Sequence, residues 1–144
     1  MDEKAYNFFD LTEIKSRFPD HAESMIVDAY LSDHDSASSR LFRLYHPIPR
    51  HLHQTCDEHL VLLDGEVDFT IADEPPRRLR AGQVVTFLRN IVHGIQPVEA
   101  AAPAVFFTVD TPRRAPGDVH FVDPAEAKGR RFVTHLASYE ARSA

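Results

Sequence analysis

Short apolar runs separated by prolines and polar turn residues divide the chain into brief segments, a pattern that favours strands over long helices. The stretch 111–117, with two prolines and a glycine, is typical of a loop, and residues 118–144 fit either a strand or a short helix. The pattern indicates an all-β domain. The segments with strand character are residues 25–31, 39–46, 58–63, 66–72, 84–88, 91–96 and 104–110.

A two-residue Asp64-Gly65 turn predicts a hairpin between residues 60–63 and 66–71. Asp-Gly readily takes the positive φ angles that such a turn demands. In the second strand apolar and polar residues alternate, which is the period-2 signature of one buried and one wet face. We therefore expect both strands to contribute inward-facing apolar side chains: Leu60, Leu62, Val67, Phe69 and Ile71.

Residues 60–63 are apolar on both faces, so this strand is expected to be covered on both sides. Val61 and Leu63 would lie on its outer face. Because monomers seldom leave large apolar patches in water, we expect a homodimer. A rival cover for this face is the N-terminal segment that contains Phe8, Phe9 and Phe18.

One short helix is predicted near the start of the chain. Asp10 can cap it, and Glu13 can reach back in a capping-box arrangement. Pro19 ends the pattern. Three apolar residues share one side of this helix: Leu11, Ile14 and Phe18.

The size and composition of the chain fit one folded domain over residues 1–144. Hydrophobic residues make up 43% and charged residues 26%, which is normal for a soluble globular protein. No apolar run approaches the roughly 20 residues that span a bilayer. The acidic start lacks the basic and apolar regions of a secretion signal, so we expect a cytoplasmic protein with no membrane partner.

The charge and cysteine content narrow the partners further. A net charge of -6 argues against a nucleic-acid partner, because duplex binding depends on Lys and Arg neutralising phosphates. The single cysteine, Cys56, excludes an internal disulfide and a thiolate-rich zinc site, and we interpret it as a packed turn residue. Any metal must then be held by histidine and carboxylate side chains.

His51 and His53 lie two residues apart, so in an extended chain their side chains project from the same face. A continuous strand would place Glu58 on the opposite face. The polar segment 54–57 is therefore expected to turn the chain, so that Glu58 opens the next strand facing back toward the histidines. In that phase His59 faces outward.

These positions match two spaced motifs. His-any-His, four residues, Glu, six residues and Gly are filled by His51, His53, Glu58 and Gly65. Around His93 the second motif is partly kept: Gly82, Asn90 and Pro97 stand at its Gly, second Gly and Asn positions, and Leu88 replaces its Pro. Tyr45 replaces the Gly expected ahead of the first motif.

Over about residues 45–97 the chain thus resembles the cupin superfamily. The resemblance implies a small single-domain protein with a double-stranded β-helix, or jelly-roll, barrel over about residues 25–125, preceded by the short N-terminal helix. It also implies one divalent metal ion inside the barrel. The ligands carried over by the motifs are His51, His53, Glu58 and His93.

Three imidazoles and one carboxylate suit Fe(II), Mn(II), Ni(II), Cu(II) or Zn(II), and their affinity order cannot choose among these metals. One or two coordination positions would stay open for water, dioxygen or a substrate oxygen. The residual positive charge favours a small anionic or carbonyl-bearing ligand. Arg43 and Tyr45 share the parity of His51 on the preceding strand, so we expect them to reach such an anion.

Two functions follow from this set of residues. The first is a metal-dependent enzyme of the dioxygenase or isomerase type acting on a small molecule. The second is a non-enzymatic small-molecule-binding or sensory barrel, since a fold does not determine a function. No general base or nucleophile stands out beside the predicted ligands, so the catalytic residues are unknown. The remaining histidines without partners at ligand spacing are interpreted as surface residues: His21, His34, His120 and His135.

Overall fold

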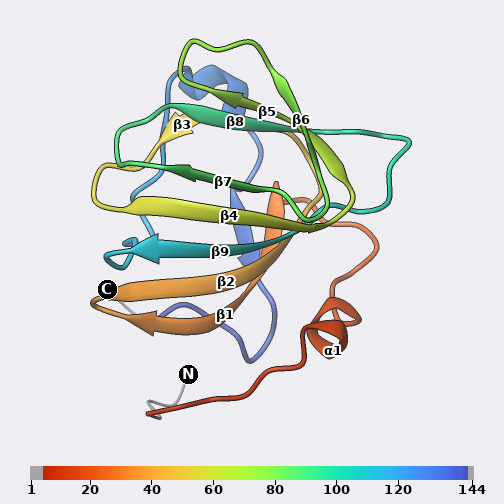
Figure 1. Ribbon diagram of the computed structural model, residues 1–144, viewed down its shortest axis with the longest axis vertical. Helices are drawn as coiled ribbons and strands as arrows, with labels where there is room; N and C mark the ends of the chain where they lie inside the picture. Colours follow the sequence, from red (N-terminus) through yellow and green to blue (C-terminus); the bar gives the residue numbers. More distant parts are fainter. Residues whose placement is uncertain (1–4, 143–144) are drawn as a thin grey trace.

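A computed structural model describes residues 5–142 of the chain, which form two facing β-sheets (Figure 1). Within these residues no helix is long and apolar enough to cross a bilayer. In chain order the elements are α1 (Leu11–Lys15), β1 (Ile26–His34), β2 (Ala37–Leu44), β3 (Ile48–Leu52), β4 (Asp57–Asp64), β5 (Glu66–Ile71), β6 (Arg77–Arg80), β7 (Val84–Phe87), β8 (His93–Pro97), β9 (Val105–Thr111), β10 (His120–Phe121), the 3-10 helix η1 (Pro124–Ala127) and β11 (Val133–His135).

The two sheets have the strand orders β11-β1-β2-β9-β4-β7 and β10-β3-β8-β5-β6. Every neighbouring pair is antiparallel except β1 and β11. The apolar core lies between the sheets, and the inward-facing residues predicted on β4 and β5 belong to it. Leu60, Leu62, Val67 and Phe69 are buried, and Ile71 packs against them half-buried.

The predicted hairpin between β4 and β5 is wrong. β4 pairs with β7 and β9, whereas β5 pairs with β6 and β8, so the chain changes sheets at Gly65. Gly65 has a φ of 83°, and a Cβ there would lie 2.6 Å from the carbonyl oxygen of Ala102. A glycine is needed at this corner for the backbone angle and for the close approach. The sequence signalled a tight turn but not which strands it separates.

The N-terminal helix forms as predicted, with Asp10 accepting hydrogen bonds from the backbone N–H groups of Thr12 and Glu13. Glu13 does not complete the capping box, because its carboxylate pairs with Arg17 one turn later. Ile14 and Phe18 are buried against the outer face of the six-stranded sheet. The helix therefore covers part of the sheet that would otherwise face water.

The packing of the N-terminal helix on the six-stranded sheet covers part of the apolar surface from which the homodimer was predicted. Leu63 packs against the cluster that contains Ile14 and Phe18, so the rival cover accounts for its outward face. Phe8 takes no part in that cover, because 94% of it is exposed. Val61 is half-buried and lies opposite Phe107 of β9. The homodimer stays a prediction.

The C-terminal segment adds one edge strand to each sheet, beside β1 and beside β3. It contains both kinds of structure that its sequence allowed, with β10 pairing with β3, β11 pairing with β1, and η1 between them. Phe121, Phe132 and Val133 pack against the core from this segment. On β11, His135 is half-buried rather than a free surface residue, and its Nδ1 lies 2.6 Å from Asp28 Oδ1 on β1.

The His135–Asp28 pair should make stability depend on pH. The hydrogen bond to Asp28 raises the pKa of His135, while burial opposes this shift. The pair therefore stabilises the fold fully below the unfolded pKa, about 6.5, and this contribution is lost as pH rises through the higher folded pKa. We expect His135→Gln to lower Tm by several degrees near about pH 6 and by clearly less near about pH 9.

Thermal unfolding of both proteins across this range measures the effect, and His34→Gln, at an exposed histidine, is the control. A Tm difference for His135→Gln that is equal at both pH values would show that the pair has no pH-dependent role.

Candidate metal centre

Three strands bring the four predicted ligands to one end of the barrel. His51 lies near the end of β3, His53 just after it, Glu58 at the start of β4 and His93 at the start of β8. β3 and β8 are antiparallel, with His51 directly opposite His93. In Figure 1 this is the end toward which the arrowheads of β7 and β9 point. All four side chains are buried, none more than 5% exposed.

The side chains face one another closely. The ring centroids of His51 and His93 are 4.1 Å apart, and the centroid of His53 lies 5.2 Å and 5.1 Å from them. The ligand atoms of the three histidines all lie within 4.8 Å of one another. Glu58 faces the same point, with Oε2 3.3 Å from Nε2 of His53 and Oε1 3.9 Å from Nε2 of His93.

Each imidazole is oriented by a backbone carbonyl. Nδ1 of His51 lies 2.8 Å from the oxygen of Pro49, Nδ1 of His53 2.7 Å from that of Asp118, and Nδ1 of His93 3.0 Å from that of Ile91. A carbonyl oxygen can only accept a hydrogen bond, so Nδ1 carries the proton in each ring. The unprotonated Nε2 atoms are then free to bind a metal, and hydrogen bonds of this kind are usual behind metal-bound histidines.

The turn after β3 is fixed by Asp118, a residue that sequence reasoning missed. Its carboxylate accepts hydrogen bonds from the backbone N–H groups of Gln54 and Thr55, at 2.8 and 2.9 Å, and from the Thr55 hydroxyl. The predicted turn at 54–57 is thus confirmed, and Glu58 does face the histidines. No spacing rule links these residues, because Asp118 lies 65 positions after His53.

Burial sets the protonation states at this end of the barrel. It lowers the pKa of His51 well below its ordinary value and that of His93 to about 4. Burial alone would raise the pKa of Glu58, but the contacts with His53 and His93 outweigh it and hold that pKa well below the ordinary value. At neutral pH His51 and His93 are therefore neutral and Glu58 is ionised, which are the states that bind metals.

The donor set fits a divalent transition metal. Three neutral imidazole nitrogens and one carboxylate oxygen are ligands for Fe, Mn, Ni, Cu or Zn. Nε2 of His93 is buried and has no hydrogen-bond partner among the described residues. An unpaired buried acceptor is costly unless something binds it. A metal ion between the three Nε2 atoms would satisfy it.

The cavity beside these ligands is small. Its volume is about 20 Å³, and its lining includes Arg40, Arg114 and Phe132 as well as the four predicted ligands. Such a volume holds about one water molecule. The two arginines were not singled out in the sequence, where only the strand phase of Arg40 could have signalled an inward position.

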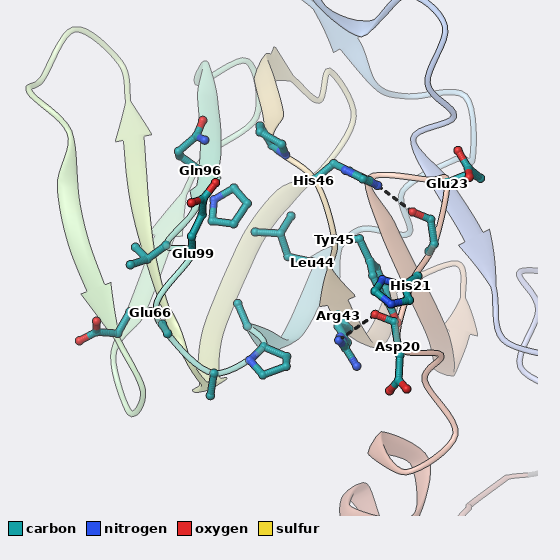
Figure 2. Close-up of a pocket in the computed structure, with 18 of the residues that line it drawn as sticks. Asp20, His21, Glu23, Arg43, Leu44, Tyr45, His46, Glu66, Gln96 and Glu99 are labelled. Atoms are coloured by element: carbon teal, nitrogen blue, oxygen red, sulfur yellow. Dashed lines mark hydrogen bonds between the residues drawn. The ribbon is translucent and has the colours of Figure 1, made fainter.

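Arg43 and Tyr45 lie elsewhere, which corrects the expectation that they reach an anion at the metal. Their side chains contact the N-terminal segment, with Arg43 Nη2 3.3 Å from the carbonyl oxygen of Asp20 and the Tyr45 hydroxyl 2.6 Å from that of Pro19. They line a separate hollow of about 690 Å³, shown in Figure 2, next to the loop that follows β8. This hollow lies at the opposite end of the barrel from His93.

Arg43 and Tyr45 face away from the metal site because the strand phase changes between β2 and β3. On β2, Arg40, Phe42 and Leu44 face inward, which turns Arg43 and Tyr45 outward. The pairing of β3 with β8 then shifts register between Ile48 and His51. Both of these residues are buried on the inner side, although they lie three positions apart. Counting alternate positions from β2 through Pro47 and Pro49 to His51 therefore predicted the wrong face for Arg43 and Tyr45.

Aromatic rings pack against the histidines on the side of β5 and β7. The ring centroid of Phe87 lies 4.2 Å from that of His93, and Phe69 stacks on the same imidazole at 6.3 Å. Phe69 also lines a pocket of about 370 Å³, whose other lining residues are both apolar, such as Leu79 and Val85, and polar, such as Arg77 and Gln83.

The remaining candidate residues do not join the site. His59 is exposed, as its strand phase predicted, and His21, His34 and His120 are exposed as well. Cys56 is buried, and burial raises the pKa of its thiol, so it is protonated at neutral pH. It packs in the turn, as interpreted from the sequence.

Comparisons with solved structures agree with this architecture. A protein with a double-stranded β-helix domain from Klebsiella pneumoniae superposes with a TM-score of 0.62 at 15% identity, covering 75% of this chain and 91% of that one. An RmlC-like cupin family protein with a double-stranded β-helix fold from Methanocaldococcus jannaschii gives 0.55 at 23%, covering 78% and 94%. DMSP lyase DddQ from Ruegeria pomeroyi gives 0.51 at 22%, covering 62% and 44%.

At these identities the superpositions establish the fold alone. No curated protein is significantly similar to the chain in sequence. Residues 44–110 match the family model of the cupin domain, and this range contains the three clustered histidines and Glu58. The two facing sheets are thus a double-stranded β-helix, and residues 44–110 of the chain carry a cupin domain.

Proposed function

We propose that the chain binds one divalent metal ion through His51, His53, His93 and Glu58 and uses it as an enzyme acting on a small anionic or carbonyl-bearing molecule. One observation carries the metal site. The Nδ1 atoms of three buried histidines are all hydrogen-bonded to backbone carbonyls, so their Nε2 atoms are left unprotonated around one point. Imidazoles serving only as packing would not need this common orientation.

A bound divalent ion would polarise an oxygen atom of a coordinated molecule. The chain supplies the surroundings for that chemistry. Glu58 contributes one negative charge, Phe69 and Phe87 keep one side of the site dry, and the backbone carbonyls hold the imidazoles in place. The same fold is found in a lyase, DddQ, which supports catalysis as a use for this barrel.

A second candidate is a small-molecule-binding or sensory barrel without catalysis. The observation that favours it is the cavity, which has a volume of about 20 Å³. Apart from the four ligands, the described residues that line it are apolar or arginine, and none is a ready general base. Access of small molecules to the metal therefore distinguishes the two candidates.

Metal content tests the ligand set. We expect about one divalent metal per chain in the purified protein, and a large loss of metal in His53→Ala and in His93→Ala, because each substitution leaves the ion short of a ligand. Elemental analysis of the folded variants measures this. His59→Ala removes an exposed histidine of β4 and should keep the metal. Normal metal content in the first two variants would rule out the assignment.

The role of Asp118 gives a subtler test. Asp118→Ala removes no ligand, but it releases the turn at Gln54 and Thr55 and loosens the carbonyl that orients His53. Groups that orient metal ligands typically change metal affinity by about 10- to 100-fold, so we expect a loss in that range by competition with a chelator. Asp20→Ala, at an exposed residue beside the hollow at the opposite end of the barrel, should leave the affinity unchanged. Equal affinities for all three proteins would contradict this role.

Exogenous anions test whether the metal has an open position. In protein loaded with Cu(II) or Fe(II), azide or a small carboxylate should change the metal's absorption spectrum, since a catalytic site keeps a position for water or substrate. Oxygen uptake or product formation with small catechols, keto acids and amino acids then tests turnover. A spectrum that none of these anions alters would favour the binding barrel over the enzyme.

A further inference from the structure

The cavity beside the histidines contains a buried arginine that lacks a matching acceptor. Arg114 follows β9, is 3% exposed and lines the cavity together with the metal-site residues. Among the residues that the structure describes, its guanidinium has one ion-pair contact, 3.5 Å from Nε to Asp110 Oδ2, and this contact lacks hydrogen-bond geometry. The ring of Phe132 lies 6.0 Å from its Cζ.

A buried guanidinium without hydrogen bonds needs an explanation. It carries a permanent positive charge, and Nε of Arg114 is buried without a hydrogen-bond partner, which is costly. Nearly all buried polar groups in folded proteins have a partner. An acceptor is therefore missing beside Arg114, inside the barrel.

Asp110 does not fill this role in the structure: its Oδ2 accepts a hydrogen bond from another arginine, and its Oδ1 has no hydrogen-bond partner among the described residues. Nη2 of Arg40 lies 3.1 Å from Asp110 Oδ2, and Nη1 of Arg40 lies 3.5 Å from Asp28 Oδ2. Arg40 thus shares two buried carboxylates from the neighbouring strands β1 and β9. Its Nε has no hydrogen-bond partner, but its two Nη atoms both have one, whereas Arg114 makes no hydrogen bond with the described residues.

The charges around the cavity point to the kind of group that is missing. Arg40 and Arg114 are opposed by three buried carboxylates: Asp28, Asp110 and Glu58. His135 also pairs with Asp28, so a divalent ion held by the histidines and Glu58 would leave the barrel interior with an excess of at least one positive charge. One monoanion in the cavity would balance that charge and supply the acceptor for Arg114.

We propose that Arg114 binds the anionic group of the ligand that reaches the metal, and so selects small monocarboxylates. This inference rests on the proposed metal site for the second contact of the ligand. A carboxylate matches the fork of N–H groups on a guanidinium, which a single amine would not offer. The cavity holds about one water molecule in this conformation, so even the smallest acids enter only if the side chains that line it move apart.

Acetate binding tests the assignment. Acetate titrated into Co(II)-loaded protein gives a dissociation constant from the visible spectrum. We expect Arg114→Gln to raise it about 10- to 100-fold, the usual effect of losing a charged hydrogen bond, and Arg114→Lys to raise it less. Arg50→Gln is the matched control, because Arg50 adjoins His51 on β3 but is exposed. Its dissociation constant should equal that of the wild type.

Metal content is measured first in each protein, which separates the two proposals. If wild type and Arg114→Gln both hold one metal and bind acetate equally well, the role of Arg114 is refuted and the metal site stands. If the wild type holds no metal, the proposed function fails. In that case a crystal structure of the wild type grown with acetate decides the role of Arg114. The same crystal structure decides it if Arg114→Gln does not fold. Acetate within hydrogen-bond distance of the Arg114 guanidinium supports the inference, and its absence there overturns it.

Discussion

Hydrogen bonds from three imidazole Nδ1 atoms to backbone carbonyls are the interactions on which the candidate centre depends. Without these hydrogen bonds the imidazole rings could rotate. Burial alone would not make their Nε2 atoms point toward one another. Two of the carbonyls, those of Pro49 and Ile91, lie two residues before the histidine that they orient. Local strand geometry thus sets both the position and the direction of His51 and His93. His53 differs, because its carbonyl comes from Asp118, far along the chain.

The surrounding fold protects this arrangement from water and from competing charges. Phe87 of the six-stranded sheet and Phe69 of the five-stranded sheet pack against His93, and burial at this place lowers the pKa of His93 to about 4, which keeps it neutral. The buried ion pairs of Arg40 act in the neighbouring layer, where Asp28 and Asp110 hold its guanidinium against the sheet. Asp110 joins this network on β1, β2 and β9 to Arg114, whose Nε lies 3.5 Å from Asp110 Oδ2.

The spacing of His51, His53 and Glu58 was enough to predict these three neighbours, because alternation along a strand and one polar turn determine where their side chains point. His93 followed from the resemblance to a known motif. The failures have a common cause, which is that strand phase does not persist through irregular backbone. The shift between Ile48 and His51 reversed the expected side of Arg43 and Tyr45, and the corner at Gly65 joined different sheets where a hairpin was expected. Arg114 and Asp118 follow loops, so no periodicity could place them.

The C-terminal segment has a consequence for how the centre and the fold influence each other. Asp118 orients His53, and the rings of Phe121 and Phe132 lie 5.7 and 6.0 Å from that of His51. The segment therefore belongs to the wall of the site as well as to the barrel. Docking of this segment and occupancy of the site are thermodynamically linked, and each must strengthen the other by the same factor. Residues that never touch a ligand, along the short β10 and β11 pairings, can in this way adjust its affinity.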